Sequence, residues 1–300
     1  MNHDIKVSHL TKKFGNVTAI DNVSIDVNDA SCVGLLGPNG AGKSTMMKAI
    51  TNILKPTSGR IEIGGVHVSS NPKKALKEVG SLVEYPKFYP YLTGLESLYF
   101  VCRIKGMKRK ECQDEIERVA KLTGVSGYLD KKTGSYSRGM NQRVALSSAL
   151  LCNPRVLILD EPTFGLDPKG MKEMRQLLKK INGEKESIIL LSSHLIYEIN
   201  EVCDRVVIVN GGKVAYDSET PDNEQWMAIK LDKLPEDTTF LKKFSSEFRS
   251  DGTRLILKKN EKIPNNEVLM ELMEMGLSVE SFGEYDTLED IYISIVDSKR

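Results

Sequence analysis

The segment from Gly37 to Ser44 constrains the fold of this chain more than any other part of its sequence. It reads GPNGAGKS and matches the phosphate-binding loop pattern G-x-x-x-x-G-K-S/T at every fixed position. The apolar run over 32–36 predicts a buried parallel strand before the loop, and the stretch 43–54 predicts a helix after it. The glycines let backbone N–H groups turn towards a phosphate, and the helix N-terminus adds the positive end of its dipole. The sequence therefore predicts an α/β fold with a phosphate site at the end of a strand.

The composition is that of a globular protein without a strong charge bias. The 300 residues are 40% hydrophobic and 28% charged, with a formal net charge of +1. This balance gives no support to binding nucleic acid through bulk electrostatics. The five cysteines show no zinc-site or disulfide spacing, which favours a reducing compartment. No run reaches the ~20 apolar residues that cross a bilayer, so we expect a cytoplasmic chain whose membrane role would come through a partner.

Predicted strands alternate with predicted helices along the first 220 residues. The strands are expected at 5–10, 22–27, 60–63, 79–83, 156–159, 187–191, 206–209 and 213–216, and the helices at 169–181 and 195–202. The pattern from about 93 to 151 is helical, which predicts a helical subdomain inserted between two core strands. The expected fold class is α/β: a P-loop NTPase core with a mostly parallel sheet, an antiparallel β subdomain and the inserted helices.

The character of the sequence changes after about residue 220. Strands are expected near 226–231, 254–258 and 277–282, and helices at 236–247, 265–275 and 287–297. This stretch carries no recognisable chemical motif. We therefore expect a nucleotide-binding domain over 1–220 and a small α/β accessory domain over 225–300.

Two carboxylates, Asp160 and Glu161, directly follow the apolar run 156–159. A buried strand does not tolerate unpaired charge, so we expect this pair at the strand end, facing a ligand. With the phosphate loop upstream, Asp160 would hold the shell of a Mg²⁺ ion, and Glu161 would polarise an attacking water as general base. Lys43 would reach the β- and γ-phosphates, and the Ser44 hydroxyl would ligate Mg²⁺. An ordinary acidic loop is the alternative, which the upstream motif disfavours.

These motifs, with a further segment downstream, resemble the nucleotide-binding subunits of ATP-binding-cassette (ABC) transporters over residues 1 to about 218. The segment 136–143, YSRGMNQR, is similar to the family signature L-S-G-G-Q-x-Q-R. Ser137 and Gly139 match that signature, whereas Arg138 and Met140 depart from it.

Three further positions extend the resemblance. The segment 164–167, FGLD, resembles the D-loop of the family, and His194 lies where the family has its switch histidine. Phe14 lies where the family places the aromatic residue that stacks on adenine, although a lone aromatic is more often part of a core or a surface.

The resemblance implies an ATPase whose two copies pack head-to-tail around two molecules of ATP with Mg²⁺. Each site would take Ser137 and Gly139 from one copy and the remaining groups from the other, so that ATP bridges the copies until hydrolysis removes the bridge. The implied catalytic residues are Lys43, Glu161 and His194, and the implied metal contacts are Ser44, Glu84 and Asp160. The implied nucleotide-binding residues are Phe14, Gly37, Pro38, Asn39, Gly40, Ala41, Gly42, Lys43, Ser44, Thr45, Ser137 and Gly139.

Glu84 stands where the family usually has a glutamine. A glutamate can still accept a hydrogen bond from metal-bound water, and its charge would favour the metal more strongly. This departure resembles the subunits that serve bacterial bacitracin- and lantibiotic-type self-protection exporters. The nearby aromatic residues form either a small local core or a docking groove for a helix of a membrane partner; they are Tyr85, Phe88, Tyr89 and Tyr91.

The leading hypothesis is the ATP-hydrolysing motor of a membrane exporter for antimicrobial peptides or drugs, held at the inner face of the plasma membrane by a multi-span permease. Two alternatives stay open: a mechanical ABC ATPase that signals through a membrane partner, and a soluble ABC-type ATPase that acts on the ribosome or DNA. The single phosphate loop and the lack of a sustained heptad run disfavour the second. The accessory domain is expected to stabilise or regulate the dimer.

Overall fold

The computed structural model describes residues 4–28, 32–84, 87–184, 187–220, 226–235, 239–245, 247–258, 260, 263–285 and 287–297. The chain divides into two compact units, one over residues 1–220 and the other over residues 221–297, and each is described by itself. Within the described ranges, no helix combines the length and the hydropathy that a membrane span requires.

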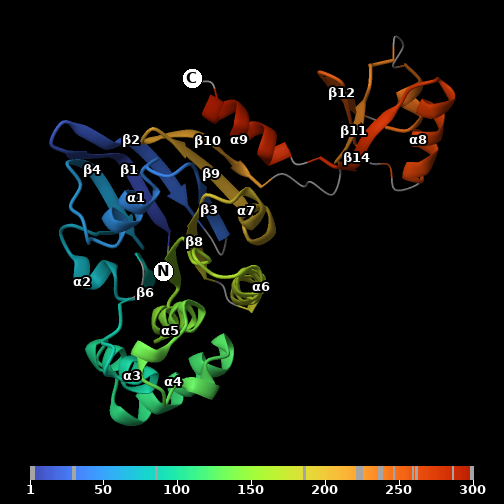
Figure 1. The fold of residues 1–300 in the computed structure, drawn as a ribbon. Coiled ribbons are helices and arrows are strands. Elements are labelled where there is room, and N and C mark those ends of the chain that lie inside the picture. The colour runs from blue at the N-terminus through green and yellow to red at the C-terminus, as the bar shows by residue number, and fades with distance from the viewer. Residues whose placement is uncertain are drawn as a thin grey trace. The chain divides into compact units, whose positions relative to one another are not determined.

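A six-stranded sheet in the order β10-β9-β3-β8-β7-β6 forms the centre of the first unit (Figure 1). Its five parallel strands are β3 (Cys32–Leu36), β6 (Val79–Leu82), β7 (Val156–Asp160), β8 (Ile188–Ser193) and β9 (Arg205–Asn210). Strand β10 (Lys213–Glu219) is antiparallel to β9. Strands β3, β7 and β8 are buried along their whole length, as expected for parallel strands covered on both faces. The segments that follow these three strands therefore meet at one edge of the sheet.

A second, antiparallel sheet in the order β2-β1-β4-β5 completes the core of this unit. It consists of β1 (Ile5–Phe14), β2 (Val17–Val27), β4 (Ser58–Ile63) and β5 (Val66–His67). The hairpin β1–β2 is longer than the sequence predicted, because Lys12, Lys13 and Phe14 continue to pair with β2 beyond the buried residues. The main hydrophobic core includes residues of both sheets and of helix α1 (Lys43–Ile50), among them Leu10, Leu35, Met46 and Ile158.

The helical subdomain lies between β6 and β7, at one end of the unit in Figure 1. Its helices are α3 (Gly94–Ile104), α4 (Arg109–Thr123) and α5 (Arg138–Leu150). A capping box starts α3: Glu96 N–H donates to Thr93 Oγ1 (3.1 Å) and Thr93 N–H donates to Glu96 Oε2 (2.8 Å). The remaining α-helices among the described residues of the unit are α2 (Pro72–Ala75), α6 (Pro168–Glu184) and α7 (Ile196–Val202).

The second unit has a four-stranded antiparallel sheet in the order β12-β13-β11-β14. Its strands are β11 (Trp226–Leu231), β12 (Phe248–Asp251), β13 (Arg254–Lys258) and β14 (Val279–Glu284), and its α-helices are α8 (Asn265–Glu274) and α9 (Thr287–Asp297). A 3-10 helix over Thr239–Lys243 lies between β11 and β12, so the order up to β14 is that of a split β-α-β unit. This unit has its own core, which includes Ile229, Leu255 and Leu272.

The expected helix over 236–247 is wrong. The described residues of that stretch form only the 3-10 helix, and the unexpected strand β12 follows it. Ser245 accounts for the change of direction, because its hydroxyl donates to the carbonyl oxygen of Lys258 (2.9 Å) and accepts from the N–H of Glu247 (3.2 Å). Such local hydrogen bonds of a serine compete with helix formation.

Candidate nucleotide-binding site

A cavity of about 440 Å³ lies where the segments after β3, β7 and β8 meet. Most of the predicted phosphate-loop residues line it, together with three residues from the other two segments and one from β2. The lining residues are Ala19, Asn39, Gly40, Ala41, Gly42, Lys43, Ser44, Thr45, Glu161, Phe164 and His194. The sheet edge therefore brings together residues that are up to 175 positions apart, from Ala19 to His194.

The phosphate loop depends on Gly42 at the N-cap of α1. Its φ of 108° is in the left-handed region, and a Cβ atom at this position would lie 2.5 Å from the carbonyl oxygen of Ala19. Gly37 is equally restricted, because a Cβ atom there would lie 2.2 Å from the carbonyl oxygen of Val209. Only glycine fits at these two positions without displacing the backbone of neighbouring strands.

Lys43 is the buried cation of the cavity, with 5% of its surface exposed. Its Nζ donates to the carbonyl oxygens of Gly37 (2.6 Å) and Pro38 (3.3 Å) and lies 3.6 Å from Glu161 Oε1. Burial lowers the pKa of the Lys43 ammonium group, and the carboxylates of Glu161 and Asp160 oppose this shift. The ammonium group is therefore held at the loop before any phosphate arrives.

Asp160 ends β7 with its carboxylate directed at the loop. Asp160 Oδ1 accepts from Ser44 Oγ (3.0 Å) and from Ser192 Oγ (2.6 Å). The Ser44 hydroxyl and the Asp160 carboxylate are oxygen donors of the kind that Mg²⁺ prefers. Among the described residues no group of three His, Cys, Asp or Glu side chains could hold a metal by itself. The donor set thus fits a Mg²⁺ ion that takes its other ligands from water and a bound phosphate.

Glu161 and His194 form a hydrogen-bonded pair at the cavity. His194 Nδ1 donates to Glu161 Oε2 (2.8 Å), and Glu161 itself has a φ of 48°, in the left-handed region. A non-glycine residue in this region is uncommon and is often found at a functional site. Phe164 borders the same pair, with its ring centroid 6.4 Å from that of His194 in an edge-to-face arrangement.

Phe14 and Glu84 are predicted residues that lie outside this lining, as do Gly37, Pro38 and Asp160. Phe14, at the end of β1, is half exposed, and Lys12 Nζ lies 5.0 Å from the centroid of its ring. Glu84 forms an ion pair with Lys48 of α1, whose hydrogen bond lowers the pKa of this carboxylate. The adenine contact of Phe14 and the metal contact of Glu84 stay predictions. Tyr85, which belongs to the predicted aromatic stretch with Phe88, Tyr89 and Tyr91, lies outside the described residues.

The signature segment begins α5 and does not contribute to the cavity lining. Ser137 is the N-cap of α5 and accepts a hydrogen bond from the N–H of Met140 (3.2 Å). A Cβ atom on Gly139 would have only Leu166 Cδ2 nearby, at 3.7 Å. The guanidinium group of Arg138 lies 5.8 Å from the ring centroid of Phe164, which connects the signature to the D-loop within one copy.

Sequence reasoning missed Ser192 and gave no separate role to Gln142 of the signature segment. Ser192 bonds to Asp160, and Gln142 Nε2 donates to the carbonyl oxygen of Pro162 (2.8 Å), which ties α5 to the segment after β7. The signal for Ser192 was its position two residues before His194, at the end of a fully apolar run. Its partner could not be inferred without the pairing of β7 with β8.

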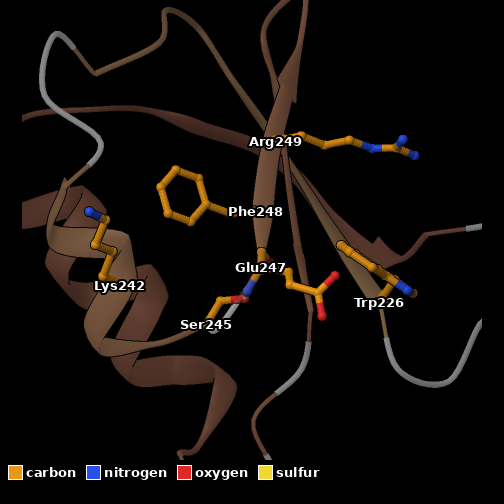
Figure 2. Close-up of a pocket in the computed structure, with 6 residues that line it drawn as sticks. All are labelled: Trp226, Lys242, Ser245, Glu247, Phe248 and Arg249. Carbon is orange, nitrogen blue, oxygen red and sulfur yellow. Dashed lines mark hydrogen bonds between the residues drawn. The ribbon is translucent and has the colours of Figure 1, made fainter.

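A larger hollow of about 650 Å³ lies in the second unit (Figure 2). Figure 2 shows Phe248 and Arg249 pointing to opposite sides of β12, with Lys242 on the side of Phe248 and Trp226 on the side of Arg249. The two cations of the lining therefore do not converge on one point. Ser245 also lines the hollow, but its hydroxyl already forms hydrogen bonds with the backbone of Lys258 and Glu247. This hollow lacks the convergent polar groups that mark a binding site.

Comparison with known proteins agrees with this geometry. The family model described as "ABC transporter" matches residues 20–164. The bacitracin transport ATP-binding protein BcrA of Bacillus licheniformis is 39% identical over 231 residues, which cover 76% of this chain and 74% of that protein. The uncharacterized ABC transporter ATP-binding protein YdbJ of Bacillus subtilis (strain 168) is 33% identical over 294 residues, which cover 96% and 94% of the two chains.

A solved structure gives the same result. The dimeric structure of a post-hydrolysis state of the ATP-binding cassette MJ0796 bound to ADP and Pi superposes with a TM-score of 0.66 and 28% identity. The match covers 72% of this chain and 98% of that one. The resemblance inferred from the motifs is therefore confirmed, as is the α/β fold class. The chain belongs to the ABC transporter family as an ATP-binding subunit and an ATPase.

Proposed function

We propose that this chain is the ATP-hydrolysing motor subunit of a bacterial membrane exporter that confers self-protection against antimicrobial peptides of the bacitracin class. The observation that carries the ATPase part is the Glu161–His194 pair at 2.8 Å beside the phosphate loop. The similarity to a bacitracin transport protein over three quarters of the chain supports the exporter class.

Each group of the cavity has a distinct role in hydrolysis. Lys43 binds the β- and γ-phosphates, while Ser44 and Asp160 would hold Mg²⁺. The ion, when bound, neutralises charge that develops on the phosphate oxygens. Glu161 accepts the proton of the attacking water, and His194 keeps the carboxylate of Glu161 oriented towards that water.

Two copies of the chain complete the sites by packing head-to-tail. The position of Ser137 and Gly139 supports this arrangement, because neither lines the cavity of its own copy. Ser137 is exposed at the N-terminus of α5, where a phosphate of the opposite copy is stabilised by the helix dipole. The accessory domain over 225–300, which spans most of the second unit, stabilises or regulates this dimer.

A multi-span permease holds the motor at the inner face of the plasma membrane. Tyr89 and Tyr91, just before the helical subdomain, are 55% and 65% exposed. Their rings stack on each other with centroids 5.6 Å apart. This exposure favours the docking groove over the local core, since aromatic side chains supply contact area at low entropic cost.

The experiment that tests the exporter is recovery of partners with a hydrolysis-deficient variant. Tagged Glu161→Gln protein is isolated from membranes and cytosol in Mg-ATP, and the partners are identified by mass spectrometry. We expect a multi-span permease, and we expect native cells without this chain to become more sensitive to bacitracin. A permease without any change in sensitivity would overturn bacitracin-class peptides as the substrate and leave the membrane partner intact. Ribosomes or DNA-bound proteins would overturn the exporter and leave the ATPase intact.

Replacing both tyrosines, Tyr89→Ala and Tyr91→Ala, is expected to abolish recovery of the permease. The loss of two exposed aromatic anchors reduces affinity by about 100-fold or more if both are hot spots. The ATPase rate of the isolated double variant stays near that of the wild type, because neither ring lines the cavity. Phe282→Ala, which removes a partly exposed aromatic from the second unit, is the matched control. Equal permease recovery with and without the tyrosines would rule out this docking surface.

A further inference from the structure

We propose that Ser192 is a positioning residue for ATP hydrolysis, which fixes Asp160 and Glu161 relative to each other. This inference rests on the roles proposed above for these two carboxylates. Ser192 belongs to β8 and pairs in register with Asp160 of the neighbouring parallel strand β7. It is completely buried, with 0% of its surface exposed.

One hydroxyl group serves both carboxylate residues. Ser192 Oγ donates to Asp160 Oδ1 (2.6 Å), and the same oxygen accepts from the backbone N–H of Glu161 (3.0 Å). The donor of a hydroxyl and one of its acceptor sites are thus both used. A hydrogen bond to a carboxylate is among the stronger ones in proteins, and burial excludes competing water.

The bond to Asp160 is independent of the phosphate loop. Asp160 Oδ1 has two donors, Ser44 Oγ and Ser192 Oγ. The Ser44 hydroxyl is the one expected to turn towards Mg²⁺ when the ion is held, whereas Ser192 lies in the interior of the sheet and keeps its partner. Ser192 therefore preserves the orientation of the Asp160 carboxylate after Ser44 has left it.

The hydrogen bond between Ser192 and the backbone N–H of Glu161 fixes the conformation of the proposed general base. The φ of Glu161 is 48°, a conformation that persists only where the surroundings enforce it. Acceptance of the Glu161 N–H by Ser192 fixes the peptide plane before this residue. The side chain then reaches both His194 Nδ1 (2.8 Å) and Lys43 Nζ (3.6 Å).

The adjacent Ser193 has a different task, which explains why two serines precede His194. Successive side chains of a strand point to opposite faces. Ser193 Oγ donates to Glu198 Oε2 (2.6 Å) and accepts from the N–H of Leu195 (3.0 Å), so it organises the start of α7. Of the two serines, Ser192 is the one that bonds to the Asp160 carboxylate and to the backbone N–H of Glu161.

The test compares Ser192→Ala with Ser192→Thr, which restores the hydroxyl. Ser147→Ala is the matched control, because Ser147 is also completely buried and hydrogen-bonded, to Thr123 (2.7 Å) in the helical subdomain. For Ser192→Ala we expect kcat to fall by about 10- to 100-fold, the effect of losing a hydrogen bond to a charged group. Ser192→Thr and Ser147→Ala retain most of the wild-type kcat.

A second readout is nucleotide binding, measured by fluorescence with ATP in the presence of Mg²⁺ or of EDTA. Ser192→Ala is expected to bind ATP in EDTA like the wild type, which also reports that the variant is folded, and to lose most of the enhancement that Mg²⁺ gives. A Ser192→Ala variant with wild-type kcat and wild-type Mg²⁺ enhancement overturns the proposal, as does a Ser192→Thr variant as impaired as Ser192→Ala. Glu161→Gln and Asp160→Asn are assayed in parallel. If both variants keep hydrolysing ATP, the roles proposed for Glu161 and Asp160 are refuted, which is a different outcome from a failure of the Ser192 proposal.

Discussion

Glu161→Gln is expected to retain ATP binding while kcat falls by about 10²- to 10⁴-fold, the range by which general-base catalysis accelerates a reaction. Glutamine has nearly the same shape as glutamate but cannot accept the proton of the attacking water. The carboxylate lies between Lys43 Nζ (3.6 Å) and His194 Nδ1 (2.8 Å), so the substitution removes the proposed base without opening a cavity. Phosphate release under ATP saturation gives kcat, and a fluorescent ATP analogue gives the dissociation constant.

The control for this experiment is Glu117→Gln, on the exposed face of α4. Glu117 forms an ion pair with Lys121 one turn later and lies far along the chain from the cavity lining. Because exposed pairs of this kind contribute little to stability, we expect wild-type turnover. Hydrolysis by Glu161→Gln within about tenfold of wild type would lie below the range of a lost general base and would mean that another group takes the proton.

The core of the first unit could be predicted because its signals are local. The apolar runs that became β3, β7 and β8 are each followed directly by a functional segment: the phosphate loop, Asp160 with Glu161, and His194. A buried strand needs only its own residues to be recognised, and parallel strands end at the same edge. The convergence of the phosphate loop with Asp160 and Glu161 could therefore be predicted from the strands, and the resemblance to the family added His194.

The parts that could not be predicted depend on partners distant in the chain. The role of Ser192 arises from the register of β8 with β7, which no local pattern encodes. Glu84 pairs with Lys48, a residue of α1 that nothing in the sequence marks as its neighbour. The failed helix over 236–247 has the same cause, because the hydroxyl of Ser245 is bound by the carbonyl group of Lys258 on β13.

Lys43→Ala is expected to weaken ATP binding by about 100-fold or more. A hydrogen bond to a charged group contributes about 1.5–3 kcal/mol, and every 1.4 kcal/mol is tenfold in affinity. The variant also leaves the carboxylates of Glu161 and Asp160 at the cavity without the cation that now lies beside them, so the phosphates of ATP would approach uncompensated negative charge. The dissociation constant is measured with a fluorescent ATP analogue at constant ionic strength.

Lys48→Ala provides the matched control for the loss of a lysine from α1. Lys48 lies on the same helix, but it contacts Glu84 and does not line the cavity. Lys48→Ala removes the same charge farther from the cavity, where solvent screens the interaction with a phosphate. We therefore expect the dissociation constant of ATP to change by less than about threefold. If both variants weakened ATP binding equally, the effect would come from the net charge of α1. The specific contact of Lys43 with the phosphates would then be refuted.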